Sequence, residues 1–96
     1  MILDISSEWC MPCKTIDKVL NQFQNEGLID LIQIDIDQHQ DFKKALEIAT
    51  VPTLLFFKDG ELLQKDIAVS GQILVKNGIM RGTTGELILR EIIKQM

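Results

Sequence analysis

Between residues 9 and 14 the sequence reads Trp9-Cys10-Met11-Pro12-Cys13-Lys14. The short apolar run before it, Met1 to Ile5, predicts a strand, and the residues from Met11 onward predict a helix. Cys10 therefore stands at the N-terminus of a helix, where unpaired backbone N–H groups and the positive end of the helix dipole favour an anion. This placement favours the thiolate form of Cys10 and makes the cysteine pair the first candidate for chemistry.

Two cysteines at this spacing fit thiol–disulfide exchange. A thiol with a pKa near 8.5 is only ~3% thiolate at pH 7, and about 2 kcal/mol of differential stabilisation makes it half thiolate. Two intervening residues let the Cys13 sulfur reach Cys10 within one helical turn, and Pro12 has no N–H to lose there. We expect the Cys10 thiolate to attack a substrate disulfide, and Cys13 to attack the mixed disulfide that results and so release reduced substrate.

Three other interpretations of the cysteine pair stay open. A zinc site needs four ligands, but the sequence has no third cysteine and His39 is its only histidine. Either cysteine could be an inert packed thiol, although the two flank Pro12 directly after Trp9. The third interpretation is a domain that keeps the fold and the motif for docking and has little redox turnover.

Hydrophobic periodicity predicts alternating helices and strands in the first half of the chain. One helix runs from Met11 to a stop at Gly27, with apolar positions at helical spacing: Ile16, Val19, Leu20 and Phe23. The β-branched run Leu31–Ile36 predicts a second strand. Residues 41–49 predict a second helix with Asp41 as a candidate cap and these apolar positions: Phe42, Ala45, Leu46 and Ala49.

The second half predicts mostly strands. Thr53–Phe57 stands between Pro52 and the hairpin signal Asp59-Gly60 and has the pattern of a strand covered on both faces. Strand character continues beyond it, with turns at Ser70-Gly71 and Asn77-Gly78, through three segments: Leu62–Val69, Ile73–Val75 and Ile79–Met80. A last helix opens at Thr84 and Gly85, and its inward stripe is expected at Leu87, Ile88, Ile92 and Ile93.

The predicted order of elements is β-α-β-α-β-β(-β)-α. Because a helix joins the first two strands, these strands should be parallel, whereas the third and fourth should form an antiparallel hairpin. A mixed sheet with helices on its faces buries all the apolar stripes. We therefore expect one α/β domain over residues 1–96.

Composition excludes several classes of protein. A hydrophobic content of 46% rules out a disordered tail, and the longest apolar run, Val51–Phe57, is far shorter than the roughly 18 to 20 residues of a membrane span. Fourteen acidic and ten basic residues give a net charge of −4 without a basic cluster, so we expect no nucleic-acid partner. Two cysteines and no signal-peptide pattern predict a cytoplasmic protein.

Two motifs together resemble the thioredoxin family. The first is Trp-Cys-x-Pro-Cys-Lys after an Ile-Leu-Asp strand. The second stands some forty residues further on: Val51-Pro52-Thr53-Leu54-Leu55-Phe56-Phe57-Lys58-Asp59-Gly60. The order of the two motifs and their separation also agree with the family. The resemblance covers about Ile2–Leu63 and resumes over Gly82–Ile93. It implies a thioredoxin-like fold with a mixed four- or five-stranded sheet, core order 2-1-3-4, and helices on both faces.

The resemblance also implies roles for individual residues. Pro52 matches a cis proline that faces the cysteines, and Val51 matches the residue whose backbone pairs with a substrate strand. Asp4, six residues before Cys10, matches a buried acid that exchanges a proton with Cys13. The alternatives are a solvated acid on a frayed strand and, for Trp9, an aromatic without a contact role. The substrate-binding residues implied are Trp9, Met11, Pro12, Val51 and Pro52.

Three departures from the family stand out. Full-length thioredoxins carry a strand and a helix before the segment that matches Met1, which leaves Leu31–Ile36 as an open edge of the sheet. Met11 replaces the usual glycine, Ser6 a common tryptophan and Gln33 a lysine near the buried acid. The segment 64–81 is longer than the family's hairpin and predicts an extra β-hairpin or a twisted ribbon, which either adds buried area or presents a partner surface.

The implied activity is thiol–disulfide oxidoreduction, in the direction that reduces protein disulfides. It requires no cofactor beyond a redox-active Cys10–Cys13 disulfide, and it implies protein disulfide substrates and an electron donor of the thioredoxin-reductase type. We expect a monomer or weak dimer with no membrane partner. The alternatives are a docking module and a reductant dedicated to one partner, which Met11 and the segment 64–81 favour.

Overall fold

The computed structural model describes residues 1–45, 48 and 50–96. Leu46 and Ala49, two predicted inward positions of the second helix, lie outside these residues. In chain order the elements are β1 (Ile2–Ser6), α1 (Met11–Asn25), β2 (Leu31–Asp35), the 3₁₀ turn η1 (Ile36–Gln38), α2 (Gln40–Ala45), β3 (Thr53–Lys58), β4 (Glu61–Leu62), β5 (Ile67–Val69), β6 (Gln72–Val75), β7 (Ile79–Arg81) and α3 (Glu86–Lys94). The predicted alternation of strands and helices is confirmed, but Asp41 lies in the first turn of α2 and is not its cap.

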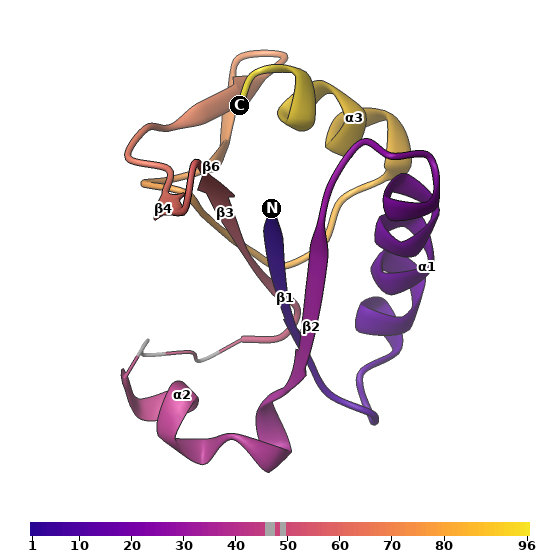
Figure 1. Ribbon diagram of the computed structural model, residues 1–96, viewed down its shortest axis with the longest axis vertical. Coiled ribbons are helices and arrows are strands. Elements are labelled where there is room, and N and C mark those ends of the chain that lie inside the picture. The colour runs from indigo at the N-terminus through magenta and orange to yellow at the C-terminus, as the bar shows by residue number, and fades with distance from the viewer. Residues whose placement is uncertain (46–47, 49) are drawn as a thin grey trace.

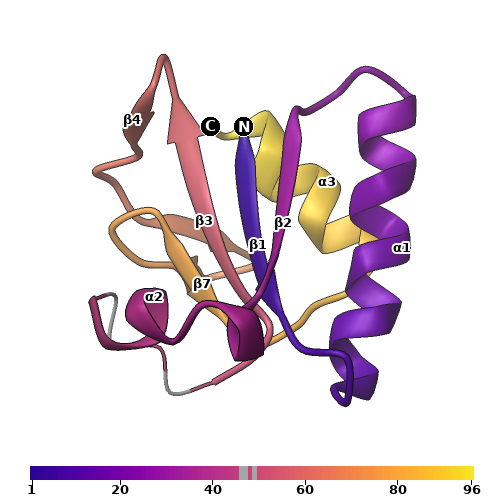
Figure 2. The same cartoon turned by 60° about the horizontal axis from the view of Figure 1, so that its bottom comes forward.

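A mixed five-stranded sheet forms the centre of the fold (Figures 1 and 2). β1 is parallel to β2 on one side, as predicted, and antiparallel to β3 on the other. The far edge of β3 differs from the prediction because two strands share it. β4 pairs only with the end of β3 at Phe57 and Lys58, and β7 pairs with Thr53 to Leu55. The order 2-1-3-4 thus holds at one end of the sheet, while β7 occupies the fourth place along the rest of the edge.

Three tight turns fix the hairpins of the second half. Asp59-Gly60, Ser70-Gly71 and Asn77-Gly78 all have positive φ at both residues, from 50° to 82°. This is the geometry of type I′ turns, whose twist matches that of the flanking strands. At Gly78 the requirement is also steric, because a Cβ atom there would overlap the backbone oxygen of Leu63.

Helices α1 and α3 cover one face of the sheet (Figure 2). The predicted stripe of α1 packs on it through Ile16, Leu20 and Phe23, which are buried together with these side chains of β1, β3 and α3: Ile2, Leu54, Phe56, Leu89 and Ile92. Each such side chain contributes roughly 1.5–3 kcal/mol of hydrophobic free energy. This cluster fixes the position of α1, whose first turn carries the cysteines.

The inward face of α3 differs from the prediction. Leu87 is 82% exposed and Ile88 is also exposed, whereas Leu89 is buried. The side chains that face the core are Leu89, Ile92, Ile93 and Met96, a complete i, i+3, i+4, i+7 set. The helix is apolar on two sides, and only one of them meets the sheet.

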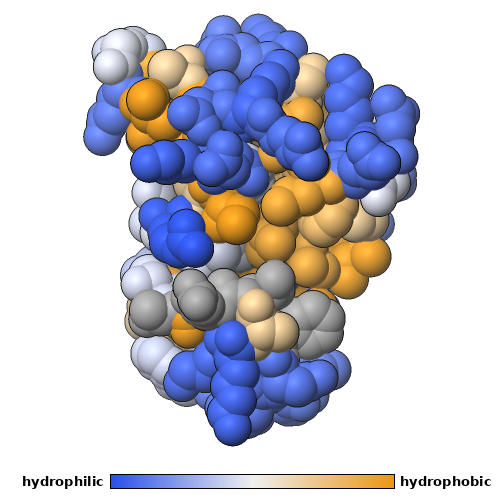
Figure 3. Space-filling view, turned by 90° about the vertical axis from the view of Figure 1, so that its left-hand side faces the viewer, coloured by the Kyte–Doolittle hydropathy of each residue, from blue (hydrophilic) through white to orange (hydrophobic). Residues whose placement is uncertain are grey.

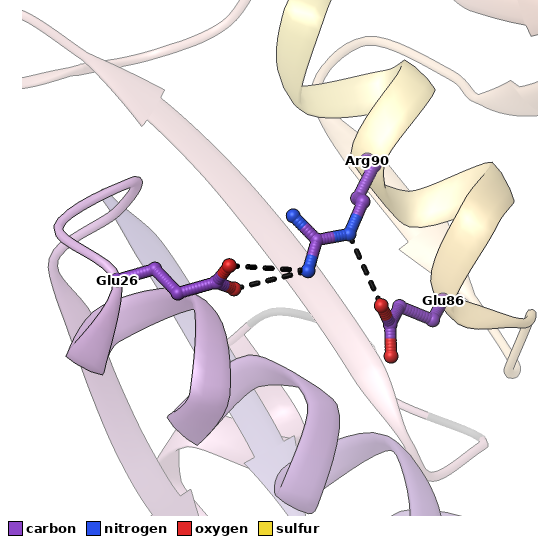
Figure 4. A network of polar contacts seen from close by, with 3 residues as sticks. All are labelled: Glu26, Glu86 and Arg90. Carbon is purple, nitrogen blue, oxygen red and sulfur yellow. Dashed lines mark hydrogen bonds and ion pairs between the residues drawn. The ribbon is translucent and has the colours of Figure 1, made fainter.

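Arg90 joins α3 to the C-terminal end of α1 (Figure 4). Its Nη2 lies 3.0 Å from Glu26 Oε2 and its Nε 3.1 Å from Glu86 Oε2. The guanidinium also stands 4.7 Å from the centroid of the Phe23 ring. One half-buried side chain therefore connects two helices through charge and stacking.

The segment 64–81 contains the predicted extra hairpin, β5–β6. Ile67 of β5 and Val75 of β6 are buried in the core with α3, and Gln95 Nε2 donates to Ala68 O at 3.0 Å. The hairpin therefore adds buried area to the core, which is the first of its two predicted roles.

Among the described residues, the second face of the sheet is covered mainly at one end. There Ile36 and Ile48 pack on Ile5 and Leu55, close to η1 and α2. Further along the same face, the side chains of Leu3, Phe57, Leu62 and Ile79 are only partly buried. Figure 3 shows apolar surface in the middle of this side of the molecule. β2 is an edge strand, as predicted, with Ile32 exposed on it.

Candidate functional site

The cysteine pair lies at the junction between β1 and α1 and forms a disulfide. The Cα atoms of Cys10 and Cys13 are 5.2 Å apart. Cys10 is the N-cap of α1, and the backbone N–H of Cys13 donates to Cys10 Sγ at 3.2 Å. Pro12 occupies the first turn, where a missing N–H breaks no helical hydrogen bond. A sulfur at this N-cap receives a backbone donor and faces the positive end of the helix dipole.

The two sulfurs lie under an exposed apolar rim. Cys13 is fully buried and Cys10 is 3% exposed, whereas Trp9 and Met11 on either side of Cys10 are 71% and 69% exposed. Two large exposed apolar side chains therefore stand beside the disulfide.

The second motif lies against the first. The Val51–Pro52 peptide bond is cis, and Cys10 Sγ lies 3.7 Å from Val51 O. Pro52 is buried and Val51 half-buried. Segments 41 residues apart in the chain are thus in contact, as the resemblance implied.

Trp9 is held by a residue that the sequence reading missed. Its Nε1 donates to Asp37 Oδ2 at 3.0 Å, and Ser7 Oγ donates to the same oxygen at 3.0 Å. Beside the disulfide this arrangement forms one wall of a pocket of about 340 Å³, lined by Trp9, Ile36, Asp37, Lys43, Ile48, Thr50 and Val51. The available signal was positional, since Asp37 comes two residues after the end of the strand parallel to β1 and so lies at the same end of the sheet as Cys10.

Asp4 is fully buried on β1 and is not a solvated acid. Burial above all, and then the neighbouring carboxyl of Asp17, raise its pKa to about 8, although a hydrogen bond from Gln33 opposes the rise. Gln33 Nε2 donates to Asp4 Oδ2 at 3.2 Å. Asp17 is the second residue that the sequence reading missed, and the signal for it was a charged residue four positions after Cys13, next to the inward stripe of α1.

Other kinds of site have no support in the described part of the chain. Residues 1–45, 48 and 50–96 contain no group of three or more His, Cys, Asp or Glu side chains placed to hold a metal ion. Within the same residues, no helix has the length and apolar character to cross a membrane. The disulfide is the one redox group found among these described residues.

Comparison with known proteins agrees with this geometry. The sequence model of the family described as Thioredoxin matches residues 1–80. Thioredoxin C-2 of Corynebacterium nephridii is 32% identical over 72 residues, which cover 73% of this chain and 67% of that protein. Thioredoxin of Staphylococcus haemolyticus is 35% identical over 66 residues, covering 67% of this chain and 64% of that protein. The chain therefore spans about two thirds of the length of the curated relatives it matches.

Solved structures show the same fold. Oxidised mitochondrial thioredoxin 3 of Saccharomyces cerevisiae aligns with a TM-score of 0.70 and 25% identity, over 99% of this chain and 76% of that one. A thioredoxin variant from Halobacterium salinarum aligns with a TM-score of 0.75 and 24% identity, over 98% of this chain and 71% of that one. The alignments extend over nearly all of this chain, including the hairpin segment that departs from the family's sequence pattern.

Proposed function

Because the chain belongs to the thioredoxin family, we propose that it is a thiol–disulfide oxidoreductase that reduces protein disulfides through Cys10 and Cys13. The observation that carries the proposal is the position of the disulfide. Cys10 Sγ caps α1 and accepts a hydrogen bond from the N–H of Cys13, and it faces the carbonyl of Val51 beside the cis proline.

The first step needs Cys10 as a thiolate. When the disulfide is reduced, the donor at the N-cap and the helix dipole stabilise negative charge on this sulfur, and about 2 kcal/mol is enough to make half of it ionised at pH 7. The thiolate attacks one sulfur of a substrate disulfide. A bond forms between Cys10 and that sulfur, the substrate disulfide breaks, and the second substrate sulfur leaves as a thiolate.

The second step uses Cys13. This thiol gives its proton to Asp4, which the fold buries on the α1 side of the sheet, and the resulting thiolate attacks Cys10 Sγ. The Cys10–Cys13 disulfide forms, the mixed disulfide breaks, and the substrate leaves with both sulfurs reduced. An external donor of the thioredoxin-reductase type then returns two electrons and two protons to the pair.

The substrate binds against the rim of the site. Trp9 and Met11 give apolar contact, Pro12 and Pro52 border the disulfide, and the backbone of Val51 pairs with an extended substrate segment. Because Met11 replaces the smaller glycine usual in the family, the rim is more apolar here and favours partners with an apolar residue next to the cystine. We place the activity in the cytoplasm, where the glutathione and thioredoxin systems keep thiols reduced.

Cysteine variants test the proposal in an insulin-reduction assay with dithiothreitol as electron donor. Cys10→Ser should abolish turnover, and Cys13→Ser, which leaves the nucleophile in place, should accumulate a mixed disulfide with insulin. Full activity of Cys10→Ser would overturn the assignment of the nucleophile.

The direction of the reaction is tested by the reduction potential against glutathione. A value well below that of glutathione is expected for a reductant, and for a two-electron couple about 30 mV corresponds to a tenfold change in the equilibrium constant. A potential above that of glutathione would make the protein an oxidant. Absence of turnover in the wild-type chain would favour the docking module instead.

A further inference from the structure

Two carboxyl groups meet between β1 and α1 without enough hydrogen-bond donors. Asp4 projects from β1 and Asp17 from α1, and Oδ1 of each is buried with no hydrogen-bond partner among the residues that the structure describes. Gln33 donates to the other oxygen of Asp4. Neither Oδ1 has a described donor, yet the two side chains lie close enough to interact strongly with each other.

A single proton resolves this arrangement. Two ionised carboxylates only accept hydrogen bonds, so side by side they repel and leave buried oxygens unpaired, which costs about 1–3 kcal/mol for each group. If one of them is protonated, its O–H donates to the other. We propose that Asp4 and Asp17 share one proton, and that Asp17 carries the proton of Asp4 to and from solvent during the redox cycle.

The outer side of Asp17 has the access that this role requires. Asp17 lines a surface pocket of about 300 Å³ together with Ser6, Ser7, Glu8, Lys14, Gln33, Ile34 and Asp35. Asp4 itself is fully buried, so it needs an intermediate group to exchange protons with water. Asp17 is half-buried and borders both the buried acid and the pocket.

The charges around the pair come from every element packed against it. α1 contributes Lys14, the loop before it Glu8, and β2 Asp35, all on the pocket side. β3 places the uncharged Leu54 opposite Asp4. Lys14 is therefore the one cation among the residues that line this pocket.

The relay rests on the proposed function and completes its second step. Before the step Asp4 holds the shared proton and Asp17 is ionised. The proton passes to Asp17, Asp4 accepts the proton of Cys13, and Asp17 releases its own proton to water in the pocket. One proton enters from Cys13 and one leaves, so the pair ends as it began and never carries two charges. Asp17 is a positioning residue in this scheme, because it acts on Cys13 only through Asp4.

The raised pKa of Asp4 explains why a second carboxyl is needed for proton transfer. With a pKa of about 8 the carboxyl is mostly protonated at pH 7. A carboxyl in that state cannot accept a proton from Cys13 unless it first passes its own to another group. Asp17 is the neighbouring acceptor, and its negative charge is also one cause of the raised pKa.

The shared proton can be measured in the oxidised protein, where no turnover is needed. Carboxyl carbon shifts of Asp4 and Asp17 are followed by NMR from pH 3 to 10 in wild type, Asp17→Asn and Glu8→Gln. In wild type both signals should move in two common steps. In Asp17→Asn the midpoint of Asp4 should fall by about one pH unit, because the neighbouring charge is gone. Glu8→Gln removes a charge from the same pocket and should leave both midpoints unchanged. Independent one-step titrations, or an unchanged Asp4 midpoint in Asp17→Asn, would overturn the proposal.

The relay is measured by the pH dependence of insulin reduction. General acid–base groups contribute typically 10²- to 10⁴-fold, and since Asp4 remains, Asp17→Asn should slow turnover about tenfold at pH 7 and shift the pH–rate profile. Asp17→Glu should restore much of the rate. If Asp17→Asn reduces insulin as fast as wild type at every pH, the relay is refuted but the proposed function is not. If the wild-type protein itself is inactive, the proposed function is refuted.

Discussion

Asp4→Asn should make the folded protein more stable at neutral pH. The carboxyl of Asp4 holds its proton more tightly in the folded protein, where its pKa is raised to about 8, than in the unfolded chain, where the value is 3.8. Between these values the unfolded state binds fewer protons than the folded state. The free energy of unfolding therefore falls as the pH rises from about 4 to about 8. An asparagine has no proton to lose, and its amide can donate to Asp17 as a protonated Asp4 would.

The size of the effect follows from the same two values. One pKa unit corresponds to about 1.4 kcal/mol. Because the unfolded chain loses the proton that the folded state keeps, the free energy of unfolding of the wild type is lower than below pH 4 by ~4 kcal/mol at pH 7 and by ~6 kcal/mol above pH 8. Small domains are stable by about 5–15 kcal/mol, so this one group controls a large part of the total.

Urea unfolding at pH 4.5, 6.0 and 7.5, with the disulfide intact, measures the effect. The free energy of unfolding of wild type should fall steadily over this range, while that of Asp4→Asn should stay nearly constant. The difference between the two proteins should be largest at pH 7.5. Glu8→Gln serves as the control for removal of an exposed charge nearby and should follow wild type. Parallel curves for wild type and Asp4→Asn would show that Asp4 titrates alike in both states and would refute the reasoning.

Three further predictions concern other parts of the fold. Gly78→Ala should lose ~2 kcal/mol more in urea unfolding than Gly60→Ala, because both have a positive φ but only Gly78 meets backbone atoms; equal losses would contradict the steric account. Arg90→Ala should lower the thermal midpoint at low salt, and the difference from wild type should shrink in 1 M NaCl as its ion pairs are screened; a difference independent of salt would point to stacking alone. Asp37→Ala should lower the fluorescence anisotropy of Trp9, the single tryptophan of the chain, because the indole loses its acceptor; an unchanged anisotropy would mean that packing alone holds it.

Local signals in the sequence predicted most of the fold correctly. The three dipeptide turns depend on two residues each, and the start of α1 depends on Cys10 and Pro12 within one turn. Turn conformations and helix ends are determined by residues that are neighbours in the chain, so the sequence alone can predict them. The position of the cysteine pair opposite Pro52 was also foreseen, but from the resemblance to a family and not from periodicity.

The errors concern choices made by tertiary packing. α3 has apolar residues on two sides, and the contact with β5 and the core selects Leu89 over Leu87. β7 pairs with β3, whereas β5 and β6 before it pair only with each other in a separate sheet. No local sequence pattern indicates which of these strands joins the central sheet. Asp17 and Asp37 interact with residues 13 and 28 positions away in the chain, Asp4 and Trp9, so neither has a motif of its own.

The partly uncovered face of the sheet has a practical consequence. In the described part of the chain, Leu3, Phe57, Leu62 and Ile79 offer apolar surface to solvent in the native state. Fluorescent probes that brighten on such surfaces will bind the folded protein, so melting scans that use them will begin with a high baseline and a weak transition. Circular dichroism will follow its unfolding more faithfully.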